Sequence, residues 1–120
     1  MKRMLVVEDD ILSQDVMRRI FKSDFETDMC ESAEEYYEKY SNKNYDIIIM
    51  DISLKGKKHG FDLTKEIKAS PTYTGTPILC LTAHAEMKAR KLAMESGTDL
   101  FITKPVATKV LRESVASLIK

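Results

Sequence analysis

The chain has 120 residues, and its 19 Lys and Arg residues balance its 19 Asp and Glu residues, which gives a formal net charge of zero. Leu, Ile, Val and Phe fill 30 positions, enough for a hydrophobic core, and we expect one domain over residues 1–120 because domains typically have roughly 100 to 200 residues. The balanced charge argues against direct nucleic-acid binding by excess positive charge, and the apolar runs are far shorter than the roughly 20 residues of a membrane helix.

The N-terminal segment lacks the apolar core of a secretion signal, because Glu8 follows a short apolar run. We therefore expect a cytoplasmic protein, and the start at Met1, directly before the first predicted strand, favours a natural N-terminus. Cys30 and Cys80 each lie in an apolar setting. We expect them to be buried, reduced thiols without a chemical role.

Apolar patterns predict strands and helices in alternation. The expected strands are Met4–Val7, a weaker one at Thr27–Cys30, Ile47–Met50, Ile78–Leu81 and Leu100–Ile102. A helix is expected after each strand. The inner faces are formed by Val16, Met17, Ile20 and Phe21 in the first helix, by Ala33, Tyr36, Tyr37 and Tyr40 in the second, by Leu63 and Ile67 in the third, and by Val110, Leu111, Ser114 and Leu118 in the last. This fivefold alternation predicts parallel crossovers in an α/β sandwich.

Several helix boundaries carry local signals. Ser32 and Glu35 have the spacing of a capping box, and Gly97 suits a left-handed C-terminal cap of the fourth helix. The stretch 70–77 predicts a loop. We expect Asp10 to start a helix, His59 to lie in an exposed loop, and the tyrosine stripe of the second helix to serve packing.

The residues that follow the strands carry the chemistry. Open parallel sheets bind ligands at the carboxyl ends of their strands, and here those positions hold acids (Glu8, Asp9, Asp10 and Asp51), Thr82 with Ala83, and Lys104 with Pro105. Two like charges about 4 Å apart repel by roughly 4 kcal/mol at an effective dielectric constant of about 20. If Glu8, Asp9 and Asp51 converge, the cluster needs a cation, and hard oxygen ligands beside a phosphate site suit Mg²⁺.

The motifs MLVVEDD, IIIMDISLKG, ILCLTAHA and FITKP occur in this order along the whole chain, which therefore resembles the response-regulator receiver domains of two-component phosphorelay signalling. The resemblance implies a flavodoxin-like three-layer (βα)5 sandwich with a parallel sheet of strand order 2-1-3-4-5. It also implies Mg²⁺-dependent transfer of a phosphoryl group from a phosphohistidine on a histidine kinase or a histidine phosphotransfer protein.

The resemblance assigns a role to each motif residue. Asp51 matches the phosphoacceptor. Asp9 and Asp51 would ligate the metal directly through their carboxylates. Ser53 would ligate it through its backbone carbonyl, and Glu8 would contact it through a water molecule. The phosphoryl-binding residues would be Thr82, Ala83 and Lys104. Taken singly, these residues have ordinary structural explanations, such as turns, caps and solvated loops, but their joint occurrence at the strand ends favours function.

The resemblance also implies a switch. Phosphorylation would draw Thr82 toward the phosphoryl group, Phe101 would turn into the vacated space, and the face made by the fourth helix, fifth strand and fifth helix would change for a downstream protein target. Phe101 lacks the hydroxyl of the commoner Tyr, so we expect its inward position to be partly populated before phosphorylation. We also expect a mobile fourth helix, with Ala85, Ala89 and Ala93 inward and Leu92 as the main anchor.

Three details depart from the family pattern or tune it. Glu8 replaces the more frequent Asp, and Lys55 stands where a proline is usual, in a longer, more basic loop. Phosphoryl lifetime in this family depends on the positions of Ser53 and His84, which predict a moderately long-lived phospho-form. The resemblance further implies a cis bond between Lys104 and Pro105.

Two other functions are compatible with parts of the pattern. A phosphohydrolase with an aspartyl-phosphate intermediate would share Asp51, Mg²⁺ and Lys104, but it typically has a second Asp where Ser53 stands. A receiver that acts only as a binding module would normally have lost the acceptor or the acid pair. We therefore favour a phosphorylatable receiver, not an enzyme beyond its own phosphorylation and dephosphorylation, which could also be part of a hybrid kinase or a longer regulator.

Overall fold

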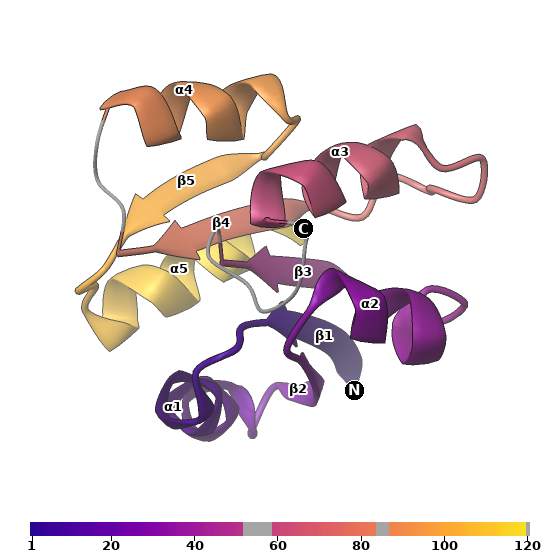
Figure 1. Cartoon of the computed structure of the whole chain (residues 1–120). Helices are drawn as coiled ribbons and strands as arrows, with labels where there is room; N and C mark the ends of the chain where they lie inside the picture. The colour runs from indigo at the N-terminus through magenta and orange to yellow at the C-terminus, as the bar shows by residue number, and fades with distance from the viewer. Residues whose placement is uncertain (52–58, 84–86, 120) are drawn as a thin grey trace.

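The computed structural model describes residues 1–51, 59–83 and 87–119, and it has a parallel five-stranded sheet between two layers of helices (Figure 1). The strands are β1 (Lys2–Val7), β2 (Phe25–Cys30), β3 (Ile47–Met50), β4 (Ile78–Thr82) and β5 (Leu100–Thr103). The helices are α1 (Ile11–Phe21), α2 (Ala33–Glu35), the π-helical η1 (Tyr36–Tyr40), α3 (Gly60–Ala69), α4 (Met87–Glu95) and α5 (Thr108–Leu118). Across these described ranges, no helix combines the length and apolar composition needed to cross a membrane.

The strand order 2-1-3-4-5 confirms the predicted fold. The register aligns the carboxyl ends of the strands, since Val7 pairs with both Cys30 and Met50, and Met50 pairs with Cys80. The residues that follow β1 and β3 are therefore neighbours at one edge of the sheet. This alignment builds the site described below.

The two faces of the sheet bury separate apolar clusters. Met4 and Val6 of β1 point to the face covered by α1 and α5, whereas Leu5 and Val7 point to the face covered by α2 and α3. Because both faces are covered, β1, β3 and β4 have continuous apolar runs, as is typical of central parallel strands. A third, smaller cluster lies between α4 and the sheet.

The second helix differs from the prediction. In place of one α-helix, α2 covers a single turn and continues as η1, in which the Ser41 N–H donates to the Tyr36 carbonyl over 2.8 Å. This i to i+5 bond widens the turn and rotates the following side chains. Tyr36 and Tyr40 pack on the core, but Tyr37 is exposed and its hydroxyl donates to the Glu66 carboxylate. The tyrosine stripe therefore serves packing only in part.

Three predicted inner-face residues lie on the surface instead. Val16 and Val110 are exposed, while their neighbours Met17 and Leu111 are buried. Leu92 is not the anchor of α4, because it is 41% exposed, whereas the adjacent Ala93 is fully buried. An adjacent helical residue lies about 100° around the axis, so the buried stripe of each helix is narrower than predicted: it includes the predicted Met17, Leu111 and Ala93 and leaves their neighbours outside.

The local signals at helix ends are mostly confirmed. Asp10 caps α1, since its carboxylate accepts from both the backbone N–H and the hydroxyl of Ser13 at 2.9 Å. These bonds lower the pKa of Asp10. The Ser32 hydroxyl accepts from the Glu35 N–H at 3.0 Å, while the Glu35 carboxylate bonds the N–H of Glu31.

Other predicted features are also present. Gly97 has a φ of 99° after α4, which is the left-handed region that favours glycine. Cys30 and Cys80 are free, buried thiols, and burial raises the pKa of each to about 12. His59 is exposed at the start of α3, and the bond between Lys104 and Pro105 is cis.

Candidate functional site

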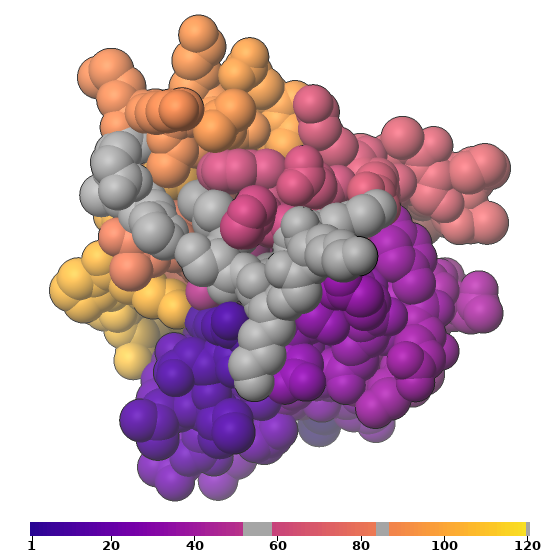
Figure 2. Space-filling model, viewed as in Figure 1, coloured from indigo at the N-terminus to yellow at the C-terminus, as the bar shows by residue number. Residues whose placement is uncertain are grey.

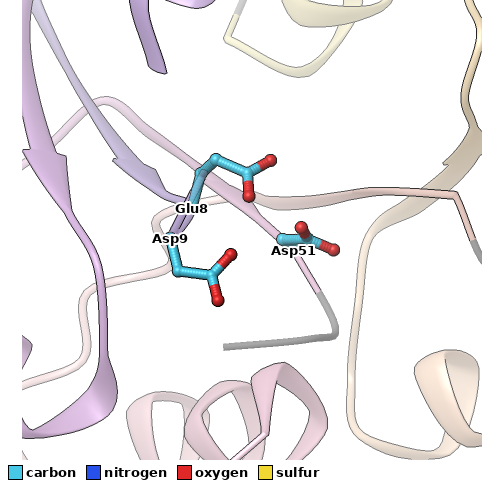
Figure 3. A group of neighbouring side chains, drawn as sticks. All are labelled: Glu8, Asp9 and Asp51. Carbon is cyan, nitrogen blue, oxygen red and sulfur yellow. The ribbon is translucent and has the colours of Figure 1, made fainter. Parts of the chain in front are cut away.

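Three carboxylates meet at the carboxyl ends of β1 and β3. Glu8 and Asp9 follow β1, Asp51 follows β3, and Figure 3 shows their side chains gathered around a common space. One oxygen of each carboxylate lies within 4.8 Å of the others. The pairing of the two strands fixes this convergence, because the Asp51 N–H donates to the carbonyl of Val7 over 2.9 Å.

Lys104 brings an ammonium group to the same edge. Its Nζ donates to Oε1 of Glu8 over 2.7 Å, although the two residues are 96 positions apart in the sequence. Its backbone N–H donates to the carbonyl of Thr82 over 2.8 Å, which fixes the end of β5 against the end of β4. The fold therefore brings together four predicted residues, Glu8, Asp9, Asp51 and Lys104.

Glu8 is the most enclosed of the acids, with 5% of its surface exposed. Burial is the largest cause of its raised pKa; the Lys104 ammonium opposes this effect, and the nearby Asp51 carboxylate adds to it. Among the described residues, this cluster sets three carboxylates against one ammonium ion. A second cation would relieve the remaining repulsion.

The donor set fits a hard divalent cation. All three side chains offer carboxylate oxygens, which are the ligands that Mg²⁺ prefers. Asp10 does not belong to this set, because its carboxylate caps α1. The structure therefore separates the acid that starts a helix from the acids that face the site.

Sequence reasoning missed Gln14, which supports the site from α1. Its side-chain amide donates to the backbone carbonyl of Glu8 over 2.6 Å, and the Glu8 N–H donates to the carbonyl of Cys30 over 2.8 Å. The Asp10 N–H also donates to Oε2 of Glu8 over 3.2 Å. The only signal was a polar amide in the first turns of a helix that follows the acids, and this pattern is too common to single out Gln14.

The predicted switch residues lie on the neighbouring strands β4 and β5, with Thr82 at the end of β4 and Phe101 paired with Cys80 two residues earlier in the register. Thr82 is fully buried at the end of β4, Ala83 after it is exposed, and Phe101 is buried on β5. Ser53 and His84, which the sequence predicted as a metal ligand and as lifetime-tuning residues, lie outside the described residues.

Comparisons with known proteins identify the family. The family model described as the response regulator receiver domain matches residues 4–116. The chain is 28% identical over 119 residues to the chemotaxis protein CheY of Halobacterium salinarum, covering 98% of this chain and 97% of that protein. It is 29% identical over 117 residues to the regulatory protein VanRB of Enterococcus faecalis, covering 98% of this chain but 51% of that longer protein. The chain thus spans about half the length of several curated relatives.

A solved structure supports the same conclusion. The receiver domain of the sensor histidine kinase PA1611 from Pseudomonas aeruginosa is 25% identical, with a TM-score of 0.88, and the match covers 98% of this chain and 97% of that one. That structure has a magnesium ion coordinated in its active site cleft. With its strand order, its acid cluster and a family match over nearly its whole length, this chain belongs to the response regulator receiver domain family of two-component signalling.

Proposed function

We propose that Asp51 is the phosphoacceptor of this receiver domain and that Glu8, Asp9 and Asp51 hold Mg²⁺ beside it. The observation that carries the proposal is the convergence of three carboxylates within 4.8 Å, with Lys104 bonded to one of them at 2.7 Å. Phosphoryl transfer needs alignment and charge neutralisation more than covalent chemistry, and this group of side chains suits both needs.

In the proposed reaction a carboxylate oxygen of Asp51 forms a bond to phosphorus as the bond from phosphorus to the donor imidazole nitrogen breaks. The imidazole leaves with the electron pair of that bond, and Asp51 becomes an acyl phosphate. Bound Mg²⁺ would neutralise charge that develops on the phosphoryl oxygens. Lys104 would exchange its bond to Glu8 for a phosphoryl oxygen, and Thr82 and the Ala83 N–H would bind the others. We further propose that the backbone carbonyl of Ser53 ligates the metal and that the side chains of Ser53 and His84 control the lifetime of the phosphoryl group.

The donor is a phosphohistidine on a histidine kinase or a histidine phosphotransfer protein, and the side of the site next to α1 suits its approach. A groove of about 360 Å³ borders Glu8, Asp51 and Lys104 and has largely apolar walls from α1 and α5. Leu12 and Val16, on the α1 wall, are 76% and 52% exposed. Such side chains favour an apolar helix face on the partner. The downstream target would bind the separate face formed by α4, β5 and α5.

Phosphorylation by a small donor tests the proposal. With Mg²⁺ and acetyl phosphate or phosphoramidate, intact-protein mass spectrometry should detect one added phosphoryl group that is lost in alkali, as expected of an acyl phosphate. Asp51→Asn should abolish this gain, whereas Asp15→Asn, which removes an exposed acid on α1, should retain it. An Asp51→Asn protein that gained the phosphoryl group as fully as the parent would overturn the assignment.

The same assay tests the metal site. Asp9→Ala removes one carboxylate from the set and should raise the Mg²⁺ concentration for half-maximal phosphorylation by at least about tenfold, because each charged ligand contributes strongly to a hard cation site. Unchanged Mg²⁺ dependence would remove Asp9 from the ligands. Turnover of small phosphomonoesters would instead favour a phosphohydrolase.

A further inference from the structure

Phe101 lies in an apolar pocket that is separate from the two main cores. Its ring is 8% exposed and packs with Cys80 of β4 and Ala93 of α4. Phe61 of α3 and Ala89 of α4 are half-buried around the same cluster. The two alanines are one helical turn apart, so together they leave space beside α4 for an aromatic ring.

The helix α4 is weakly anchored apart from this cluster. Of its described residues, Ala93 alone is fully buried, while the larger apolar residues Met87, Leu92 and Met94 are exposed. In Figure 2 this helix, in orange, forms a projecting part of the surface at the top of the molecule. Contacts between α4 and β5 therefore depend heavily on the Phe101 ring and on whatever holds it in place.

Arg90 covers that ring from the helix side. Its guanidinium carbon lies 5.1 Å from the centroid of the Phe101 ring, within the range of a cation–π interaction. A planar guanidinium can stack on an aromatic face more closely than an ammonium group can. Arg90 itself is exposed, so the contact adds an attraction to the ring without burying the positive charge.

We propose that Arg90 is a positioning residue for Phe101: its guanidinium favours the buried position of the ring and ties that position to α4. The ring can leave its pocket only by losing the contact with Arg90 as well as the contact with the alanines. A displacement of α4 would in turn carry Arg90 away from the ring. The helix α4 and the strand β5 are thereby coupled through the guanidinium of Arg90 and the ring of Phe101.

The consequence for signalling rests on the proposed function, in which Phe101 is the switch aromatic. Arg90 then sets the population of the buried ring from which phosphorylation starts. A cation–π contact at an exposed site corresponds to a change of about two- to fivefold in that population.

NMR of the full chain tests the contact. Nuclear Overhauser effects from the Phe101 ring to the Ala89 and Ala93 methyl groups report the buried ring, and ring-current shifts of the Arg90 side chain report the stacking. Arg90→Met keeps the length of the side chain but removes its charge, and it should reduce the buried-ring population about two- to fivefold. Arg90→Lys should restore part of it, while Lys91→Met should leave it unchanged, because Lys91 is exposed on the side of α4 opposite Ala89 and Ala93.

The outcomes separate the two proposals. Equal ring populations in Arg90→Met and the parent, or equal losses in Arg90→Met and Lys91→Met, would overturn the positioning role, whatever happens to phosphorylation. Absence of the upfield ring-current shift on Arg90, with Phe101→Leu as the reference, would overturn it too. Failure of Asp51 to accept a phosphoryl group would overturn the proposed function and leave the ring measurements intact.

Discussion

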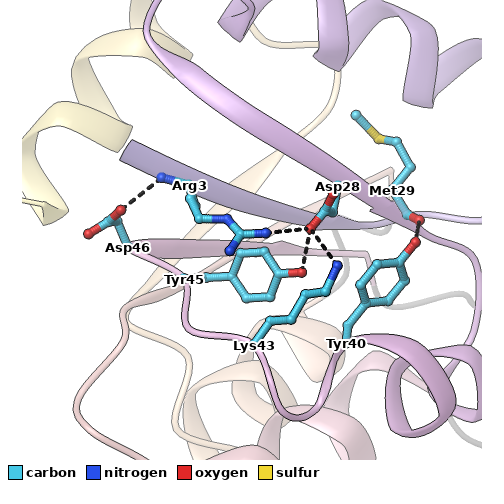
Figure 4. A network of polar contacts seen from close by, with 7 residues as sticks. All are labelled: Arg3, Asp28, Met29, Tyr40, Lys43, Tyr45 and Asp46. Atoms are coloured by element: carbon cyan, nitrogen blue, oxygen red, sulfur yellow. Dashed lines mark hydrogen bonds and ion pairs between the residues drawn. The ribbon is translucent and has the colours of Figure 1, made fainter. Parts of the chain in front are cut away.

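Two polar clusters of this protein use the same kinds of side chain in opposite ways. At the site, three carboxylates lie together and the ammonium group of Lys104 bonds to one of them, counting only the side chains that the structure describes. In a second cluster, which links β1, β2 and the segment before β3, the Asp28 carboxylate is surrounded by donors (Figure 4). It accepts the Tyr45 hydroxyl at 2.6 Å and lies 3.4 Å from the Arg3 guanidinium and 3.9 Å from Lys43 Nζ.

Other contacts of Arg3 extend the second cluster, although its Nε is buried without a hydrogen-bond partner among the described residues. The Arg3 N–H donates to the Asp46 carboxylate over 2.8 Å, and the Arg3 guanidinium lies 5.5 Å from the Tyr45 ring centroid. Arg3 and Lys43 thus match Asp28 and Asp46 in charge. These contacts hold the segment before β3 against β1 and β2.

The difference shows what distinguishes a polar cluster that holds the fold from one that binds. Charges that are matched by nearby partners stabilise the native state, whereas excess charge of one sign is tolerated only where a ligand or a reaction uses it. Within the described residues, the acid cluster is the one that gathers three charges of one sign within 4.8 Å. Substitutions in the two clusters should therefore change the free energy of unfolding by different amounts and, for some pairs, in opposite directions.

Removal of a lysine should give the largest contrast. Lys104→Met leaves the buried Glu8 carboxylate beside two other acids without its ammonium partner, and we expect the free energy of unfolding to fall by about 2 kcal/mol at pH 7.5. The matched variant Lys43→Met removes an exposed lysine 3.9 Å from Asp28 and should cost less than about 0.5 kcal/mol. Urea denaturation without divalent cations measures both.

The pH dependence of the same pair adds a control. Because the pKa of Glu8 is raised by burial, the cost of Lys104→Met should shrink as the pH falls through that raised value and the carboxyl group becomes neutral. Equal losses for Lys104→Met and Lys43→Met, at any pH, would show that the two lysines have equivalent roles.

Neutralising an acid should produce opposite signs in the two clusters. Asp51→Asn removes one of three mutually repelling charges and should raise the free energy of unfolding by about 1 kcal/mol when no divalent cation is present. Asp28→Asn weakens the bonds from Tyr45 and Arg3 and should lower it by about 1 kcal/mol. Changes of the same sign in both variants, measured by urea denaturation with a chelator, would contradict the comparison.

The sequence predicted the acid cluster well because its determinants are local. Apolar runs set the ends of β1 and β3, and parallel pairing then places Glu8, Asp9 and Asp51 at one edge. Strand order needed the family resemblance, since many α/β sequences share the same alternation of elements. The bond between Lys104 and Glu8 joins residues 96 positions apart, and the sequence could place both at the site without showing that they pair.

The second cluster could not be foreseen, because Arg3, Asp28 and Tyr45 each look like an ordinary polar residue near a strand or loop. The errors in helix faces have a related cause. The periodic pattern correctly placed Ala93 on the inner side of α4, but it took the larger Leu92 as the anchor, whereas Leu92 is 41% exposed and the small Ala93 packs with Phe101. The π-helical segment Tyr36–Tyr40 leaves no periodic signal in the sequence.

Alkaline pH should disturb the second cluster. Burial, followed by the bond to the Asp28 carboxylate, raises the pKa of Tyr45, so the folded protein keeps this proton where the unfolded chain loses it near pH 10. The stability that Tyr45 contributes is thus fully present below about pH 10 and falls as the pH rises further, by about 1.4 kcal/mol per pH unit at most.

Tyr45→Phe should lower the free energy of unfolding by about 1 kcal/mol at pH 7 through the lost hydrogen bond, and this deficit should vanish near pH 11. Urea denaturation at both pH values measures this, and a Tyr45→Phe deficit that persisted at pH 11 would show that the Tyr45 proton does not stabilise the second cluster.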